Sequence, residues 1–373
     1  MEQHLRSRGW MALLMCLCTS LWIGAQPAGF SDQIYLNGFT QAVGLTFDAN
    51  GRMYVWEKAG KVWVVENGVK RATPLIDISE EVGDWRDFGM VGFALDPNFL
   101  TNGHIYLWYV VDRHHLLYFG TPSYNPATNE YFNATIGRLT RYTATAASNF
   151  TQVDYNSRRV LIGESKSTGA PILHESHGVG QIAFGTDGTL LVSMGDGASY
   201  SSTDQGSATE TYYNQALADG IITAAENVGA YRSQQLFSQN GKIMRVDPAT
   251  GNGLSSNPFF EAGNPRSNRS RVWSYGLRNP YRFVQKPNTG SHNAAEGNPG
   301  IFYAGDVGWG SREELDVITQ GGQNFGWPKY EGMTTQPGYN NTAFTPAVHE
   351  LPRVDWRTGT ARGLINGVIY NVG

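Results

Sequence analysis

GQIAFGTDGTLLVSMGDG, residues 180–197, contains two apolar strands joined by the turn sequence TDG. Similar strand pairs recur along the chain, and in two copies a further strand led by glycine follows. Short antiparallel strands in units of about 40–50 residues predict the blades of a β-propeller, because radially packed blades cover the faces that a lone sheet would expose. A β-sandwich also repeats hairpins, but it explains the glycine-led outer strands less well. The copies lie at residues 44–65, 92–110 with 137–142, 180–197 with 241–247, and 279–290 with 313–318.

The composition agrees with an all-β protein. The 373 residues include 45 glycines and 16 prolines, which favour turns, and 12% aromatic residues, which favour strands. Charged residues make up 16%, below the usual value of about a quarter, which argues against disorder and a coiled coil. The formal net charge is −4 and no basic stretch occurs, so we expect no nucleic-acid partner.

Residues 1–25 have the features of a secretory signal peptide. Arg6 and Arg8 precede a mostly apolar run at residues 10–23, and the small residue Ala25 stands before the expected cleavage point. The apolar run is short for a transmembrane helix, and no stop-transfer pattern follows it. An N-terminal membrane anchor is the weaker alternative.

Cleavage at that point would leave residues 26–373 as the mature propeller domain. Both cysteines, Cys16 and Cys18, precede the cut, so this domain would contain no cysteine. We therefore expect a periplasmic or secreted protein that has no membrane span and folds without disulfides.

Two long polar insertions interrupt the repeats, at residues 113–136 and 198–240. Loops on a rigid scaffold often carry binding sites, and residues 212–236 could form one or two short helices. The first insertion contains His114 and His115, which we interpret as a solvated pair.

A candidate catalytic pair comes from the hairpin of residues 180–197. Pairing about a centre near residue 187 brings His177 and Asp196 to the same end of the hairpin. A carboxylate that orients a histidine ring can make it a general base, although such a pair can also simply close a turn. His174 adds an H-x-x-H spacing, but this loop supplies no third ligand for zinc.

Two further segments carry polar groups at turns. Arg278 and Asn279 follow an apolar strand, and they could bind carboxylate or quinone oxygens or serve as loop structure. The glycine-rich turn that holds Gly308 and Trp309 exposes backbone carbonyls, which are hard ligands suited to Ca²⁺. Glycine-rich corners also occur in any propeller.

Seven motifs in order resemble one family over residues 40–373. The set resembles the soluble quinoprotein glucose/sorbosone dehydrogenases, which are six-bladed β-propellers. The resemblance implies pyrroloquinoline quinone (PQQ) and Ca²⁺ as cofactors, oxidation of an aldose at C1 to the lactone, and transfer of electrons to an external acceptor such as a cytochrome or a quinone. The motifs are GFALDPNF, the HGVG before FGTDG, GDG, GKIMRVD, GLRNP, DVGWGSREELD and GGQNFGWP.

The resemblance also assigns roles to single residues. It makes His177 the base, Asp196 its carboxylate partner, Arg278 and Asn279 the neighbours of the quinone, and the carbonyls of Gly308 and Trp309 the Ca²⁺ ligands. Asp87 and Ser176 stand at substrate positions where the family often has Gln and Asp, and Trp309 stands where well-known members have Pro. These departures leave the sugar open, and a non-catalytic extracellular propeller that binds a protein or glycan through its loops is the rival hypothesis.

We count four repeats through Ile318, and a fifth is expected to begin at residues 363–370. A propeller has to close or leave a sheet edge exposed, so we expect about four to five blades here and a longer reading frame with roughly 80–100 further residues. Residues 26–373 by themselves are then expected to associate and to bind PQQ weakly, because PQQ carries three carboxylates and Arg278 is the one cation that the motifs match.

Overall fold

The structure is a computed structural model that describes residue 31 and residues 33–357. The chain divides into a unit of residues 1–38 and a unit that begins at Phe39. In the first unit, the described residues form no helix or strand. The second unit contains all the strands and helices that the structure describes.

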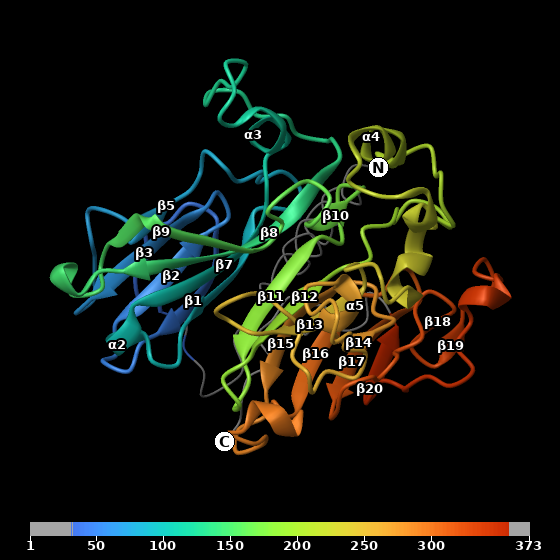
Figure 1. Ribbon diagram of the computed structural model, residues 1–373. Coiled ribbons are helices and arrows are strands. Elements are labelled where there is room, and N and C mark those ends of the chain that lie inside the picture. Colours follow the sequence, from blue (N-terminus) through green and yellow to red (C-terminus); the bar gives the residue numbers. More distant parts are fainter. Residues whose placement is uncertain (1–30, 32, 358–373) are drawn as a thin grey trace, which may run out of the picture. The chain divides into compact units, whose positions relative to one another are not determined.

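Four antiparallel sheets, here called blades one to four, lie side by side within residues 39–357 (Figure 1). The first three strands of each blade follow the chain from the inner strand outward, as the repeats predict, and the outermost strands pair with the third. Blade one contains β1 (Ala42–Phe47), β2 (Met53–Glu57), β3 (Lys61–Glu66), β4 (Val69–Lys70) and β5 (Ile76–Asp77). Blade two contains β6 (Met90–Leu95), β7 (His104–Val110), β8 (Thr135–Ala144), β9 (Val153–Ile162) and β10 (Ala170–Ile172).

Blades three and four have four strands each among the described residues. Blade three contains β11 (Val179–Phe184), β12 (Leu190–Met194), β13 (Lys242–Val246) and β14 (Val272–Tyr275). Blade four contains β15 (Pro280–Gln285), β16 (Phe302–Asp306), β17 (Arg312–Ile318) and β20 (Val354–Arg357). A small hairpin, β18 (Tyr330–Glu331) with β19 (Thr334–Thr335), lies before β20.

Packing between blades explains why the middle strands are so apolar. In blade three, every residue of β12 and β13 is buried, because neighbouring blades cover both faces. Trp108 of β7 is fully buried and donates a hydrogen bond from its indole nitrogen to the Ser193 carbonyl of β12, at 2.9 Å. Burial of apolar surface between blades is therefore the main stabilising term, and the indole bond aligns blade two on blade three.

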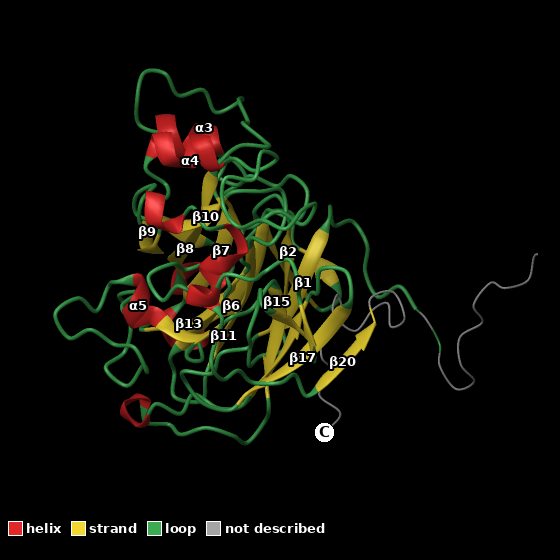
Figure 2. Cartoon of the chain, turned by 90° about the vertical axis from the view of Figure 1, so that its right-hand side faces the viewer, coloured by secondary structure: helices red, strands yellow, loops and turns green. Residues whose placement is uncertain are grey.

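The connections between strands hold the helices (Figure 2). The insertion at 198–240 does contain a short helix and two 3-10 turns, as expected. The helices are α2 (Phe99–Asn102), α3 (Arg113–Tyr118), α4 (Tyr213–Asp219) and α5 (Asn268–Arg271). The 3-10 turns are η1 (Ala146–Ser148), η2 (Ala224–Glu226), η3 (Gly229–Gln234), η4 (Ala294–Glu296) and η5 (Thr342–Phe344).

The interpretation of His114 and His115 as a solvated pair is wrong. Both side chains are buried at the start of α3, where the Asp112 carboxylate accepts from both backbone amides and caps the helix. His114 contacts the Glu130 carboxylate at 3.1 Å, and His115 stacks on the ring of Phe119. The cap by Asp112 fixes the start of α3 with both histidine side chains buried. Two adjacent histidines in a sequence do not reveal this arrangement.

The predicted all-β propeller fold is confirmed, with four blades in the described part of the chain. The expected fifth repeat at 363–370 and the expected signal peptide lie outside the described residues. Every helix that the structure describes is too short or too polar to cross a lipid bilayer.

Candidate functional site

The hairpin of blade three places His177 at the end of the inner strand. Ile182 pairs with Val192, so the hairpin is centred on residue 187, and the Gly197 amide donates to the His177 carbonyl at 3.1 Å. An added Cβ at Gly195 would lie 2.4 Å from that carbonyl oxygen, so glycine is required for this close approach. His177 itself has φ of 58°, a strained left-handed conformation for a residue with a side chain. The surrounding turn thus forces the imidazole into one position.

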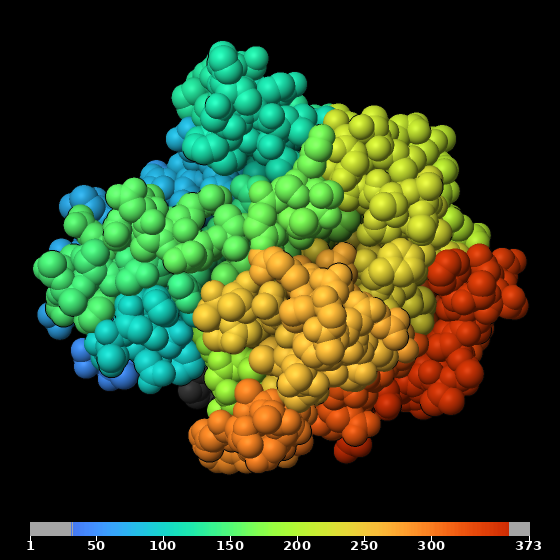
Figure 3. Space-filling view, viewed as in Figure 1, coloured from blue at the N-terminus to red at the C-terminus, as the bar shows by residue number. Residues whose placement is uncertain are grey.

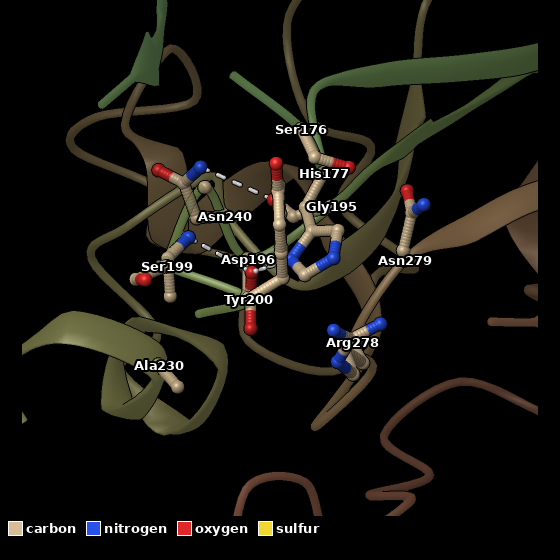
Figure 4. A network of polar contacts seen from close by, with 12 residues as sticks. Ser176, His177, Gly195, Asp196, Ser199, Tyr200, Ala230, Asn240, Arg278 and Asn279 are labelled. Atoms are coloured by element: carbon tan, nitrogen blue, oxygen red, sulfur yellow. Dashed lines mark hydrogen bonds and ion pairs between the residues drawn. The ribbon is translucent and has the colours of Figure 1, made fainter. Parts of the chain in front are cut away.

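Asp196 lies directly against the His177 ring (Figure 4). The His177 Nδ1 and the Asp196 Oδ1 are 2.8 Å apart, and both side chains are buried. The Asp196 carboxylate also accepts from the Ala198 amide at 2.9 Å and from the indole nitrogen of Trp327 at 2.7 Å. Since Nδ1 is engaged, Nε2 is the ring nitrogen left for a ligand.

Charge and burial hold this pair in one protonation state. Burial lowers the pKa of His177, nearby Arg278 lowers it further, and the Asp196 carboxylate opposes both without cancelling them. Burial by itself would raise the pKa of Asp196, but His177 and Arg278 outweigh it, so the net pKa is lowered. A neutral imidazole beside an ionised carboxylate keeps the proton on Nδ1 and a lone pair on Nε2, the arrangement a general base needs.

The lowered pKa of His177 predicts an acid limit for any reaction that needs the neutral ring. For such a reaction the neutral ring is the required form, and the pKa of His177 lies below 6.5, so turnover should stay level through neutral pH and fall only below pH 6.5. Replacing Arg278 with Met should raise the His177 pKa, because a positive neighbour is removed. NMR titration of His177 in cofactor-free protein measures that rise, and an unchanged pKa would contradict this electrostatic account.

Arg278 and Asn279 approach the same point from the loop before β15. The Arg278 carbonyl accepts from the Asp196 amide at 2.8 Å, and both backbone amides of the pair donate to the Asp306 carboxylate. The Arg278 guanidinium donates through Nη1 to the carbonyls of Val307 and Gly308, each at 2.8 Å. Its Nε is buried and has no hydrogen-bond partner within the described chain.

A cavity of about 680 Å³ opens beside these groups. Its walls include His177, Asn279, Asp87 and Ser176, so the structure brings four of the predicted residues to one hollow. The Ser176 hydroxyl donates to the Asp87 carboxylate across the wall. Arg278 does not line the cavity, but it donates to the carbonyl of Val307, which does. Gly308 and Trp309 follow Val307 in the chain.

The structure adds three cations that the motifs did not reveal. Lys58, Arg86 and Arg282 line the same cavity, against one carboxylate, Asp87. Arg282 lies on the inner strand of blade four and donates to the Val43 carbonyl of blade one and the Val91 carbonyl of blade two. These residues lie far apart in the sequence, and the radial arrangement of the blades brings them together.

The cavity fits a planar, polyanionic cofactor such as PQQ. Three lining cations, the Asn279 amide and the unpartnered Nε of Arg278 offer donors to carboxylate and quinone oxygens. Burying several carboxylates is costly without such partners. Of the partners here, Arg278 and Asn279 are buried, Lys58 and Arg282 are half-buried, and Arg86 is exposed.

The carbonyls predicted to bind Ca²⁺ do not fit the ion in this arrangement. The Gly308 carbonyl accepts from the Arg278 guanidinium, so a metal there would share its oxygen with a cation. The amides of Trp309, Gly310, Ser311 and Arg312 instead converge on one oxygen of Glu331. In the described residues, no group of three or more His, Cys, Asp or Glu side chains is placed to hold a metal. We therefore derive no step through calcium.

Trp327 is a further residue that the sequence analysis did not single out as functional. Its indole bonds to Asp196, and its ring packs in a cluster with Trp309, Tyr339 and Tyr231 and lies 5.4 Å from the Arg278 guanidinium. The GGQNFGWP motif contains Trp327, but the family resemblance assigned this residue no role. Its distance of 131 residues from Asp196 leaves no local signal of the bond.

Replacing Trp327 with Phe should shift the acid limit of activity to higher pH. The indole N–H stabilises the Asp196 anion, and without it the carboxylate holds the proton of His177 more strongly, so the His177 pKa rises. The pH dependence of kcat and the NMR titration of His177 measure this shift. Trp309→Phe is the matched control, since the Trp309 indole donates to the Tyr200 carbonyl and not to Asp196; an equal shift in both variants would contradict the assignment.

Comparison with known families gives a match along most of the chain. The family model described as "Glucose / Sorbosone dehydrogenase" matches residues 39–366. In the solved structure of a PQQ-bound aldose sugar dehydrogenase from Streptomyces coelicolor, the similar part covers 87% of this chain and 70% of that one, with a TM-score of 0.57 and 20% identity. That likeness concerns the fold.

The relatives found by sequence include Hedgehog-interacting and HIPL proteins as well as a quinoprotein glucose dehydrogenase. The HIPL2 protein of Arabidopsis thaliana is 28% identical over 323 residues, which are 76% of this chain and 40% of the relative. The human Hedgehog-interacting protein is 29% identical over 177 residues, 45% of this chain and 22% of that protein. Quinoprotein glucose dehydrogenase B of Acinetobacter calcoaceticus is 24% identical over 340 residues, 90% of this chain and 60% of the enzyme. The chain thus spans less than two thirds of the length of these relatives.

Proposed function

The chain belongs to the glucose/sorbosone dehydrogenase family, and we propose that it is a quinoprotein that oxidises an aldose at C1 to the lactone. The observation that carries this proposal is the buried His177–Asp196 pair beside a cation-lined cavity of about 680 Å³. A general base and a polyanion-binding wall at one place are what a quinone-dependent alcohol oxidation needs.

His177 would remove the proton of the C1 hydroxyl through Nε2. Asp196 would keep Nδ1 protonated and stabilise the imidazolium that forms, as its contact at 2.8 Å allows. Bound PQQ would supply the two-electron acceptor for the hydride that leaves C1. Proton and hydride together balance the oxidation of the hemiacetal to the lactone.

The other residues would bind and orient. Lys58, Arg86 and the free Nε of Arg278 would pair with cofactor oxygens, and Asn279 would hydrogen-bond beside them. Asp87 and Ser176, already bonded to each other on the wall, would contact sugar hydroxyls. Electrons would then pass to an external acceptor, a cytochrome or a quinone, and we place the protein in the periplasm or outside the cell.

The test is reconstitution of the purified protein with PQQ. Adding PQQ should change the quinone absorption spectrum with a saturable one-to-one titration, and an aldose should then reduce the bound quinone. Protein with Lys58 and Arg86 both changed to Ala should bind PQQ more weakly, because two cationic partners are lost. Failure to bind PQQ would refute the proposal.

The second candidate function is a non-catalytic propeller that binds a protein or a glycan through its loops. The similarity to the Hedgehog-interacting protein favours it. The same reconstitution separates the two functions, since a non-catalytic propeller would give no sugar-dependent reduction of PQQ.

A further inference from the structure

A second cavity lies between helix α3 and the outer strands of blades one and two. Its volume is about 460 Å³, within the range of ligand pockets, and it shares no lining residue with the cavity beside His177. The segment around α3 projects above β5, β8 and β9 (Figure 1), and the space-filling view shows it as a separate lobe over the first two blades (Figure 3). We call this hollow the α3 cavity.

Two exposed aromatic rings line the α3 cavity. Phe119, directly after α3, is 61% exposed, and Tyr155 of β9 is 53% exposed. Both are held in place, Phe119 by stacking on His115 at 4.4 Å between ring centroids and Tyr155 by accepting the Asp77 amide at 2.9 Å. Aromatic surfaces that are exposed and already oriented offer contact area at a small entropic cost.

The charges around the α3 cavity balance as a group. Glu81 accepts from Arg138 and Arg158, at 2.6 and 2.7 Å. Asp77 pairs with Lys61 at 3.3 Å, and Glu164 pairs with Arg266. The remaining lining carboxylate, Glu80, accepts from the Tyr124 hydroxyl. The lining carboxylates and arginines, taken with Lys61 and Arg266, therefore sum to zero charge, so the α3 cavity has no net charge that would favour a charged ligand over a neutral one.

Two buried nitrogens on the wall have no partner within the described chain. They are Nδ1 of His115 and Nε of Arg158, both on residues that line the α3 cavity. Leaving such groups unsatisfied is costly, so they need a ligand or water. Arg158 can only donate, whereas a neutral His115 can donate or accept, and a hydroxyl group suits both.

We propose that the α3 cavity binds a neutral saccharide. A sugar ring presents a C–H face, which packs on aromatic rings such as Phe119 and Tyr155, and a rim of hydroxyls that can both donate and accept. The polar side chains of His115 and Arg158 on the wall and the balanced charge of the cavity suit such a rim. This inference does not depend on the proposed oxidation, because the two cavities are separate.

The experiment titrates cofactor-free protein with neutral tetrasaccharides (cellotetraose, maltotetraose and xylotetraose) and with charged tetragalacturonate, by isothermal calorimetry. We expect at least one neutral tetrasaccharide to bind, and Phe119→Ala to weaken that binding about tenfold, as loss of an aromatic anchor does. Phe237→Ala is the matched control, because Phe237 is also an exposed aromatic residue and does not line the α3 cavity.

His177→Ala should leave the binding unchanged, which separates this site from the catalytic proposal. The inference is overturned if no neutral tetrasaccharide binds, if only tetragalacturonate binds, or if Phe119→Ala binds as tightly as the unchanged protein.

Discussion

Replacing His177 with alanine is expected to lower kcat for sugar oxidation by about 10²–10⁴-fold, while PQQ remains bound. The reason is that Nε2 of His177 is the basic atom of the pair, and its protonation state is set by burial, Arg278 and Asp196. Steady-state kinetics with reconstituted protein give kcat, and the quinone spectrum reports the cofactor separately. The matched control is His292→Ala, which removes an exposed histidine outside the cavity and should keep normal turnover. Near-normal turnover in His177→Ala would remove His177 from the mechanism.

Replacing Asp196 with asparagine should damage both catalysis and stability. One carboxylate oxygen of Asp196 accepts hydrogen bonds from His177 and the Ala198 amide, and the other accepts from the Trp327 indole. In asparagine one of these oxygens becomes an NH₂ group, so a donor faces a donor in either orientation of the amide. A buried mismatch of that kind costs about 1–3 kcal/mol of folding free energy. Loss of the charge also leaves the imidazolium unstabilised, so we expect kcat to fall by roughly 10²–10⁴-fold.

Asp204→Asn separates the two effects of Asp196→Asn. Asp204 is a buried carboxylate that accepts the Ser199 and Gly206 amides and does not touch His177. Its replacement should lower the free energy of unfolding, measured by urea denaturation, and spare kcat. If both variants lose stability equally and both retain kcat, Asp196 has a structural role only.

Local sequence patterns predicted the contacts within one hairpin but not the contacts between blades. His177 and Asp196 were placed together from the hairpin register, because a turn at residues 186–188 fixes which residues face each other. The sequence did not predict the contacts of Trp327 and Arg282, since their partners lie in other blades. No spacing in the sequence encodes the angle at which one blade packs on the next. The pairing of the Gly308 carbonyl with Arg278 was missed for the same reason.

The sequence by itself determined the repeating strands, the order of the blades and the hairpin that carries His177. These features follow from contacts between residues near in the chain, where alternation and turn chemistry restrict the backbone directly. Only the tertiary structure decided which cations surround the cavity, that Trp327 anchors Asp196, and that His115 is buried in the wall of the α3 cavity. Those features depend on how blades and loops distant in sequence pack against each other, and burial then sets the protonation and hydrogen bonding of each group.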